Sequence, residues 1–482
     1  MNSLQLKKLL LITTGPLACL LVTMMPLSGM PSDAKCTLAV AAWIVVWWVT
    51  EAVPIAVASL MPIVLFPLFN VLSISEVCSS YGHRYVFLFL GGFLLALALE
   101  KWDLHKRIAL GIIKKTGTGT RSMIFGFMLA SALLSMWISN TATTLMMLPI
   151  ATSVVSLLRM GSNEKQHKRF ALIVMLAIAY GANIGGIGTL VGTPPNAAMA
   201  GILSEQYNIN IGFGEWMAIA APFSFVLLFL VYFLLVYLVH PVKNKKTDSG
   251  YELIKEELKK LGRLSSPQFK VLMIFFTTAA LWILRSTINS TFGSHLDDTM
   301  ISIAAGVSLF LVPSGNKNKE GKVATLLEWE QTQKLPWGIL LLFGGGMALA
   351  AAFKSSGLIN FIGDYFASLS NYPILLLVVM LAIAALFATE LMSNLALVNV
   401  LIPVVAVIAV GMDLDPMIFA VPVTLAASCA FMLPMATPPN AIVFASGNVG
   451  IKQMALSGLV MNLVASGLIA LWVSICVHFS WL

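Results

Sequence analysis

Long apolar runs separated by short polar connections dominate this sequence. An apolar stretch of about 18 or more residues is typical of a helix that crosses a lipid bilayer. Apolar runs, some of them shorter than this, lie near residues 9–27, 37–49, 54–70, 85–99, 123–158, 170–201, 216–239, 268–287, 298–313, 336–352, 371–411, 416–446 and 453–478. The pattern therefore predicts an all-α, polytopic membrane protein.

Four of these runs do not fit a plain membrane-spanning helix. The runs 123–158 and 371–411 are too long for one crossing, and each has Ser-Asn near its middle, where lipid offers the backbone no hydrogen-bond partners. A re-entrant hairpin enclosed by protein is the structure we expect for both. The runs 170–201 and 416–446 contain Thr-Pro-Pro, which removes backbone donors and disfavours helix at the threonine, so we expect broken helices there.

The unusual motifs occur twice. Asn140 and Asn394 lie 254 positions apart, and the Thr-Pro-Pro-Asn runs 193–196 and 437–440 lie 244 apart. The larger separation also joins Gly92 with Gly346, Ser135 with Thr389, and Pro149 with Pro403. Chance similarity between apolar runs would keep leucine and alanine in register, whereas glycine, proline and polar residues repeat here. The sequence therefore predicts an internal duplication of the kind found in transporters.

Broken helices suit the transport of ions. Unwound carbonyls and the C-terminal ends of half-helices attract sodium, and half-helix N-termini attract a carboxylate. Ser135, Asn140, Thr389 and Asn394 add neutral oxygen ligands. Neither motif contains lysine or arginine, so bound sodium has to supply positive charge for a divalent anion. We therefore expect coupled transport.

Composition and charge agree with a membrane protein. Hydrophobic residues make up 59% of the chain and charged residues 10%, with a mean hydropathy of +0.90. The net charge of +8 comes from basic loops between apolar runs, so it does not indicate nucleic acid. Loops 106–121, 165–169 and 240–263 are basic, whereas 203–216 and 288–298 lack lysine and arginine. This bias predicts a cytoplasmic N-terminus, and the short external loops favour a bacterial inner (plasma) membrane.

The sequence resembles the divalent anion:sodium symporter family over nearly the whole chain. The resemblance rests on segments 48–55, 100–110, 139–141 and 342–350 and on both Thr-Pro-Pro-Asn runs. It implies inverted repeats with two re-entrant hairpins, about 11 transmembrane helices, and a homodimer whose transport domains move like elevators against a scaffold. It also implies Na⁺ as the coupled ion and a C4-dicarboxylate (succinate, malate or fumarate), citrate or sulfate as the partner anion.

The same resemblance assigns residues to roles. It implies cation ligands at Ser135, Ser139, Asn140 and Gly192, and at Thr389, Asn394 and Ala436. It implies substrate contacts at Ser139, Asn140, Thr141, Thr193, Pro194, Ser393, Asn394, Thr437 and Pro438. The expected division is scaffold helices in 1–85, the first inverted repeat in 86–239, a cytoplasmic basic loop in 240–267, scaffold helices and a loop in 268–335, and the second inverted repeat in 336–482.

One position departs from the family pattern. The first motif continues with Thr141, whereas Leu395 follows the second Ser-Asn and has no hydroxyl to donate to a carboxylate. The substrate is therefore oriented differently, is smaller or less charged at that end, or is another anion. A sodium-independent exchanger of dicarboxylate or citrate remains the rival, and Ser135 and Thr389 favour the symporter because an exchanger can dispense with them.

Two other features have alternative readings. Glu51 and Glu390, in apolar surroundings, are candidates for proton carriers, for helix caps or for partners of a nearby base. The glycine pairs and triplets near 91 and 345 are typical of close helix packing rather than of a ligand site. An intramembrane enzyme is disfavoured, because the chain has no HExxH motif and no intramembrane Gly-x-Ser-x-Gly element.

Overall fold

The computed structural model describes residues 3–27, 29–158, 164–244, 248–317, 321, 323–366, 372–479 and 481. Part of the expected basic loop, residues 245–247, and residues 480 and 482 of the expected second repeat lie outside these ranges, as do 318–320, 322 and 367–371. Helices dominate the described residues, and the two short strands β1 (Pro313–Lys317) and β2 (Val323–Thr325) form an antiparallel pair.

The first part of the chain supplies seven helices. The run predicted near 54–70 is two short helices, because the helix is interrupted at Ser59 and Leu60. The helices are α1 (Ser3–Met24), α2 (Ser32–Thr50), α3 (Ile55–Ala58), α4 (Met61–Leu68), α5 (Ile74–Tyr81), α6 (Arg84–Lys101) and α7 (Leu104–Thr116). Glu51 is the C-cap of α2, in the left-handed backbone conformation, and its side chain is exposed.

The next part contains the first hairpin and the first broken helix. The helix pairs on either side of Ser139 and of Thr193 lie where the Ser-Asn and Thr-Pro-Pro interruptions were predicted. The elements are α8 (Thr120–Ser135), α9 (Asn140–Leu158), α10 (Glu164–Ile187), α11 (Pro194–Tyr207), α12 (Phe213–Phe233), the π-helix η2 (Leu234–Val239) and α13 (Asp248–Lys260).

The last part repeats this order of helix interruptions after the helices α14 to α17. The elements are α14 (Ser266–Phe292), α15 (Asp298–Leu311), the 3-10 helix η3 (Trp329–Lys334), α16 (Trp337–Ser355), α17 (Leu358–Phe366), α18 (Ile374–Ala388), α19 (Asn394–Gly411), α20 (Met417–Ala427), α21 (Pro438–Ala445) and α22 (Ile451–His478). The interruptions at 389–393 and 428–437 again coincide with Ser-Asn and with the residues leading to Thr-Pro-Pro.

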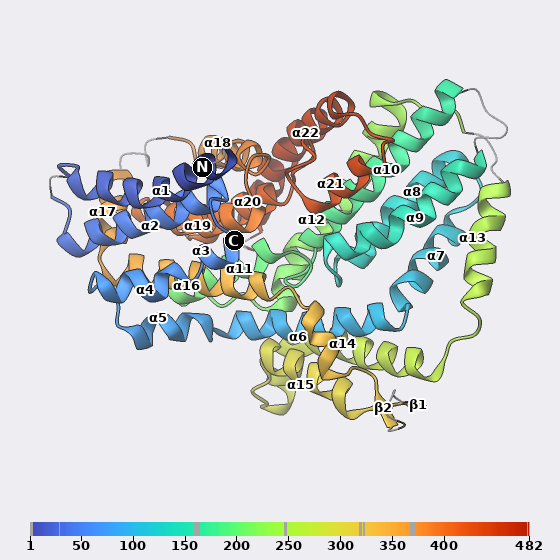
Figure 1. Ribbon diagram of the computed structural model, residues 1–482, viewed down its shortest axis with the longest axis horizontal. Coiled ribbons are helices and arrows are strands. Elements are labelled where there is room, and N and C mark those ends of the chain that lie inside the picture. Colours follow the sequence, from blue (N-terminus) through green and yellow to red (C-terminus); the bar gives the residue numbers. More distant parts are fainter. Residues whose placement is uncertain are drawn as a thin grey trace.

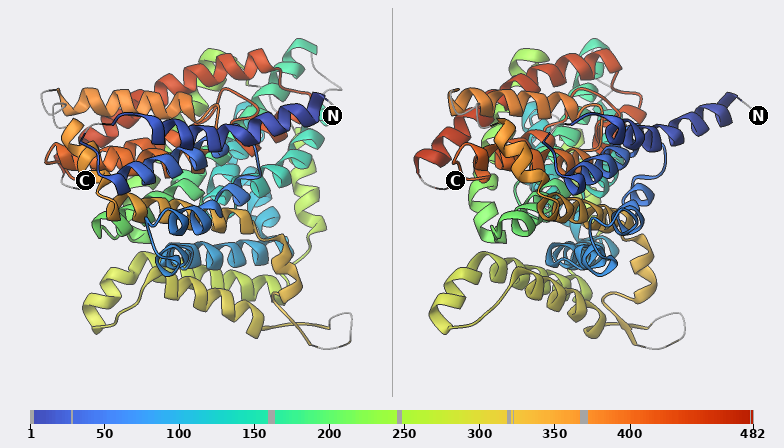
Figure 2. Two further views of the ribbon diagram at one scale, coloured as in Figure 1. Left: turned by 60° about the vertical axis from the view of Figure 1, so that its left-hand side comes forward. Right: turned by 90° about the vertical axis from the view of Figure 1, so that its left-hand side faces the viewer.

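The helices pack in groups that position the interrupted segments centrally. Helix α8 packs against α10 and α9, and α20 packs against α18, α19 and α22. The groups interlock, because α9 contacts α21 and α11 contacts α19. Figure 1 shows α13 along one edge beside α7, while α14 and α15 lie at another edge, against α6. Figure 2 shows the same edge position of α14 and α15 from two further sides.

Within the described residues, nine helical segments are long and apolar enough to cross a membrane. Segments such as Lys8–Met24 and Asp298–Leu311 are apolar but shorter. This agrees with a polytopic membrane protein. Many large apolar side chains on α1, α14 and α22 are exposed, as expected for surfaces that face lipid.

The glycine-rich stretches bring helices into close contact, as predicted. A Cβ on Gly91 would lie 2.5 Å from the carbonyl oxygen of Ser302 in α15, and the Ser302 hydroxyl donates to the Leu88 carbonyl at 2.7 Å. A Cβ on Gly346 would lie 2.5 Å from Oδ1 of Asn399 in α19. Both glycines therefore allow neighbouring helices to approach where a larger residue would clash.

Candidate functional site

The first hairpin turns at Ser139, between α8 and α9. The buried Ser135 hydroxyl, at the end of α8, donates to Asn140 Oδ1 at the start of α9. The Ser139 hydroxyl accepts from the Ala142 amide at 3.2 Å and so caps the first turn of α9. These short polar side chains satisfy backbone and amide groups where the helix stops, which explains why the apolar run turns here.

The first broken helix brings carbonyl oxygens to the same place. A Cβ on Gly192 would lie 2.5 Å from the Gly186 carbonyl oxygen and 3.0 Å from that of Ser135. A Cβ on Gly186 would lie 2.6 Å from Asn140 Oδ1 and 3.2 Å from the Gly192 carbonyl oxygen. Oxygens of these four residues therefore converge on two glycines, where no side chain would fit. A neutral set of oxygen atoms of this kind suits sodium.

Asn196 holds the shape of this break. Its fully buried side chain donates to the carbonyls of Gly186, Ile187 and Thr189 at 3.1, 3.1 and 2.7 Å. The Thr189 hydroxyl donates to the Met136 carbonyl and accepts from the Gly192 amide at 3.0 Å. The motif asparagine thus satisfies carbonyls at and just after the end of α10, where the helix is interrupted, a role that the sequence analysis did not assign.

The second hairpin repeats the arrangement at its turn. The buried Thr389 hydroxyl lies 2.7 Å from Asn394 Oδ1 and 2.8 Å from the Ala427 carbonyl oxygen, at the end of α20. Ala436 lies in the break that follows α20, and its amide donates to the Leu433 carbonyl at 3.2 Å. Thr389 therefore joins the hairpin to the second broken helix, as Ser135 and its carbonyl do in the first half.

Asn440 and Asn183 shape the second break. Asn440 donates to the carbonyls of Ala430 and Leu433, each at 3.1 Å. Asn183, in α10, donates to the Ala430 carbonyl at 3.2 Å and to the Thr437 hydroxyl at 3.1 Å. A residue of the first broken helix therefore holds the second one, and α10 also packs against α21.

Four helices begin at motif residues. Asn140 and Asn394 are the first residues of α9 and α19, and Pro194 and Pro438 are the first residues of α11 and α21. Ser393, Thr193 and Thr437 occupy the N-cap positions of α19, α11 and α21. Because the N-terminal turn of a helix has free N–H groups and a partial positive charge, these four ends can bind an anion without lysine or arginine.

The predicted substrate residues are partly accessible. Ser139, Asn140, Thr141, Ser393 and Asn394 are half-buried, Pro438 is exposed, and Thr193 and Thr437 are buried. Leu395, which replaces the expected threonine, is 4% exposed. No hydrogen bond among those of the described residues joins the two Ser-Asn turns directly, so their link runs through α10 and the broken helices.

A cleft of about 620 Å³ opens beside the first turns of α9. Ala142, Leu145 and Met146 form one wall. The opposite wall includes Glu100, Lys101, Asp103 and His105 at the junction of α6 and α7, and Gln331 and Lys334 of η3. The cleft therefore lies between the first hairpin and a separate group of helices.

Glu390 caps the second break, in agreement with the cap alternative. It is 3% exposed and accepts hydrogen bonds from the amides of Phe431 and Met432 at 2.8 and 2.9 Å, and from that of Leu433 at 3.0 Å. Asn462 of α22 also donates to it, at 2.9 Å. Sequence reasoning found the glutamate from its apolar surroundings but did not find these donors, which lie 41 to 72 positions further along the chain.

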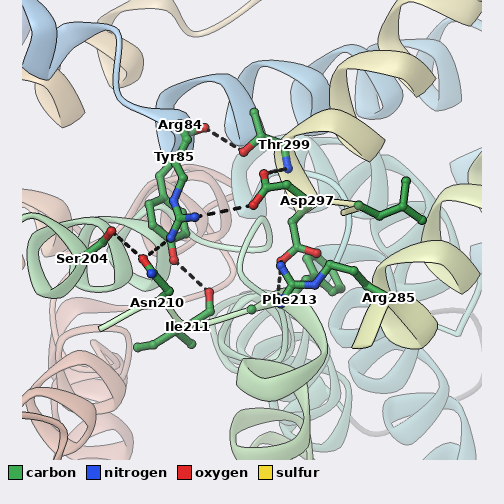
Figure 3. A network of polar contacts seen from close by, with 12 residues as sticks. Arg84, Tyr85, Ser204, Asn210, Ile211, Phe213, Arg285, Asp297 and Thr299 are labelled. Carbon is green, nitrogen blue, oxygen red and sulfur yellow. Dashed lines mark hydrogen bonds and ion pairs between the residues drawn. The ribbon is translucent and has the colours of Figure 1, made fainter. Parts of the chain in front are cut away.

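A polar network joins the connection between α11 and α12 to α6, α14 and α15, as Figure 3 shows. Arg84 bonds Asn210 Oδ1 and lies 3.5 Å from Asp297 Oδ2, and the Tyr85 hydroxyl donates to the Ile211 carbonyl at 2.9 Å. The network continues through Asp298, which accepts from the Phe213 amide at 2.7 Å and lies 3.2 Å from Arg285 Nη1. The loops that take part in this network lie within 203–216 and 288–298, the two segments that contain no lysine or arginine.

The chain is similar to known transporters in sequence. A protein of Staphylococcus saprophyticus named sodium-dependent dicarboxylate transporter SdcS is 40% identical over 444 residues, covering 90% of this chain and 84% of the relative. A protein of the same name from Staphylococcus aureus strain USA300 is 38% identical over 465 residues, covering 95% of this chain and 89% of the relative.

Two solved structures share the fold. The YdaH transporter of Alcanivorax borkumensis has a TM-score of 0.58 at 14% identity, over 84% of this chain and 88% of that protein. MtrF of Neisseria gonorrhoeae, described as an antimetabolite efflux pump, has a TM-score of 0.56 at 13% identity, over 92% and 96%. These similarities place the chain in a fold used by membrane transporters.

The family resemblance inferred from the motifs is also supported by a family model. The model for the sodium:sulfate symporter transmembrane region matches residues 5–482, which include both hairpins and both broken helices. With this match and relatives at 38–40% identity, the chain belongs to the sodium:sulfate symporter family.

Proposed function

We propose that this protein is a secondary active transporter that couples sodium to the uptake of a C4-dicarboxylate such as succinate, malate or fumarate. One observation carries the proposal: neutral oxygens meet where the two hairpin turns adjoin the two helix breaks, and four helices begin at these turns and breaks. Carbonyls and hydroxyls suit sodium, and helix N-termini suit a carboxylate. The name of the Staphylococcus relatives, sodium-dependent dicarboxylate transporter, supports the same pairing.

The first cation site in this proposal consists of Ser135, Ser139, Asn140 and Gly192. The convergence of Ser135, Asn140 and Gly192 oxygens supports it. The second site consists of Thr389, Asn394 and Ala436, supported by the bonds from Thr389 to Asn394 and to the carbonyl at the end of α20. Carbonyls of the interrupted backbone provide part of each ligand set.

The anion binds between the two breaks. Its donors are the hydroxyls, amides and backbone N–H groups at Ser139, Asn140, Thr141, Thr193, Ser393, Asn394 and Thr437, and Pro194 and Pro438 begin the helices that point toward it. Sodium binds first and fixes Asn140 and Asn394, which then present their amide N–H groups to the anion. Because neither motif carries lysine or arginine, the two sodium ions offset the charge of the dianion.

Transport then follows from movement of the hairpin-bearing helices against a scaffold. We place α8 to α12 and α18 to α22, which carry the re-entrant hairpins of the inverted repeats 86–239 and 336–482, in the moving domain, and the remaining helices in a scaffold that forms a homodimer. About 11 helices cross the membrane, with the N-terminus in the cytoplasm. The cleft between α9 and the α6–α7 junction, lined by Lys101 and Lys334, is the route to the basic, cytoplasmic side.

Uptake of radiolabelled succinate into proteoliposomes tests the proposal. We expect an inward sodium gradient to drive uptake and an equal potassium gradient to fail, with or without succinate inside. Uptake that needs internal succinate but ignores sodium would instead establish an exchanger. Failure under both conditions would exclude succinate as the substrate.

Leu395 supports a second candidate substrate. The second motif lacks the hydroxyl found at Thr141, and the leucine is buried. An anion with fewer acceptor atoms on that side, such as sulfate, needs fewer donors. Competition of sulfate and citrate against labelled succinate in the same proteoliposomes decides between these anions.

A further inference from the structure

Glu390 is a buried carboxylate whose hydrogen-bond partners, among the described residues, are all neutral groups. Oε1 accepts from the amides of Phe431 and Met432 and from Asn462 Nδ2, and Oε2 accepts from the amide of Leu433. Among the ion pairs of the described ranges, none includes Glu390. All four contacts are donors, and a carboxylate accepts such hydrogen bonds through both of its oxygens. A carboxylate therefore lies inside the second half of the molecule.

The first half has no carboxylate at the matching position. The separation of 254 that pairs Ser135 with Thr389 pairs Met136 with Glu390. Met136 is 6% exposed, and it helps to hold the first break through its backbone carbonyl, which accepts from Thr189. The first break is thus held by neutral groups alone, whereas the second is held by a carboxylate.

The carboxylate is connected to the second cation site from two directions. It follows Thr389 directly, whose hydroxyl bonds Asn394 and Ala427. It also holds residues 431–433, and Leu433 accepts a hydrogen bond from Ala436. A cation bound by Thr389, Asn394 and Ala436 lies in a protein interior, where screening is weak and attraction to a nearby carboxylate is stronger than in water.

We propose that Glu390 makes the two cation sites unequal, so that sodium binds more tightly at Thr389 and Asn394 and fills that site first. The proposal rests on the sodium coupling proposed above and adds an order to it. Glu390 is a positioning residue: it touches neither ion nor anion, fixes the backbone of the second break, and supplies a charge that the first break lacks.

Sodium-dependent thermal stability of the purified full-length protein tests this order. Sodium chloride is varied against choline chloride at constant ionic strength, without a transported anion. A ligand that binds only the folded state raises stability with the logarithm of its concentration above its dissociation constant. Two sites with unequal sodium affinities therefore produce two phases in the rise of the unfolding temperature with sodium concentration, one for each site.

We expect Glu390→Gln to move the phase at lower sodium concentration about tenfold upward, because it removes the nearby charge and keeps the side-chain size. The phase at higher concentration should stay in place. Ser135→Ala should do the reverse. A purely structural role predicts a lower midpoint at every sodium concentration, with both phases unmoved, and that result would overturn the proposal, as would an equal shift of both phases.

Two further variants separate charge from folding. Asn462→Ser keeps the carboxylate and removes one donor, so the phase at lower sodium concentration, called the tight phase below, should remain. The exchange Glu390→Gln with Asn462→Asp returns a carboxylate to the same cluster and should recover part of the tight phase, even if Glu390→Gln alone does not fold. Loss of the tight phase in Asn462→Ser, or no recovery in the exchange, would count against the charge. A wild-type protein that sodium does not stabilise would refute the sodium coupling itself.

Discussion

Two buried hydroxyls hold the asparagines that begin α9 and α19. Ser135 and Thr389 are fully buried and bond Asn140 Oδ1 and Asn394 Oδ1. We expect Ser135→Ala and Thr389→Ala each to raise the half-saturating sodium concentration for uptake about tenfold, since a net hydrogen bond is worth about 1–1.5 kcal/mol. Sodium titrations of succinate uptake measure the effect.

A matched control lies outside the site. Thr13 is exposed and bonds only the Leu10 carbonyl one turn back in α1, at 2.8 Å. Thr13→Ala should leave sodium dependence at the wild-type value. If Ser135→Ala and Thr389→Ala behave like this control, their hydroxyls do not belong to the cation sites.

Leu395 tests how the anion is held. The leucine occupies the position where the first half has the half-buried Thr141. We expect Leu395→Thr to lower the half-saturating succinate concentration about tenfold, because an added donor to a carboxylate is worth about 1–3 kcal/mol. Competition between labelled and unlabelled succinate measures it. The reciprocal change Thr141→Leu should weaken binding. An unchanged succinate affinity in Leu395→Thr means that no donor is missing there.

At the scale of elements, the network of Figure 3 connects groups that the proposed movement separates. Arg84 belongs to α6, and Asn210 lies between α11 and α12. We expect a thiol-reactive crosslinker between Arg84→Cys and Asn210→Cys, in a background without the five native cysteines, to arrest uptake. A reductant should restore it if the link contains a disulfide. Each single-cysteine variant treated in the same way is the control, and undiminished uptake by the crosslinked protein means that these elements stay together.

The helix interruptions were predictable because their causes are local. Ser-Asn and Thr-Pro-Pro disrupt the helix in which they stand, through side-chain hydrogen bonds to the local backbone and through missing N–H groups. Their recurrence in both halves distinguishes them from chance occurrences. The contacts of Asn183 with Thr437 and of Glu390 with Asn462 were not predictable, because their partners lie 254 and 72 positions away. Pairing between distant polar residues depends on packing, which periodicity does not reveal.

At the scale of the whole molecule, the two halves share their order of helices but differ in one buried carboxylate. Both halves share hairpins and broken helices in the same order, yet only the second has a carboxylate at the residue after the hairpin hydroxyl. Neither the Ser-Asn turns nor the Thr-Pro-Pro runs contain lysine or arginine. In the proposed transporter these motifs therefore carry no fixed positive charge, and occupancy by the dianion depends on sodium.

The orientation in the membrane can be tested on a single helix. Helix α14 is long and apolar enough to cross the bilayer, and Leu264 and Phe292 near its two ends are 42% and 79% exposed. Because the basic segment before α14 predicts the cytoplasmic side, an impermeant maleimide added to right-side-out vesicles should label Phe292→Cys and spare Leu264→Cys. Inside-out vesicles should reverse the pattern, and detergent should expose both thiols. The opposite pattern would invert the proposed topology and place the basic loops outside.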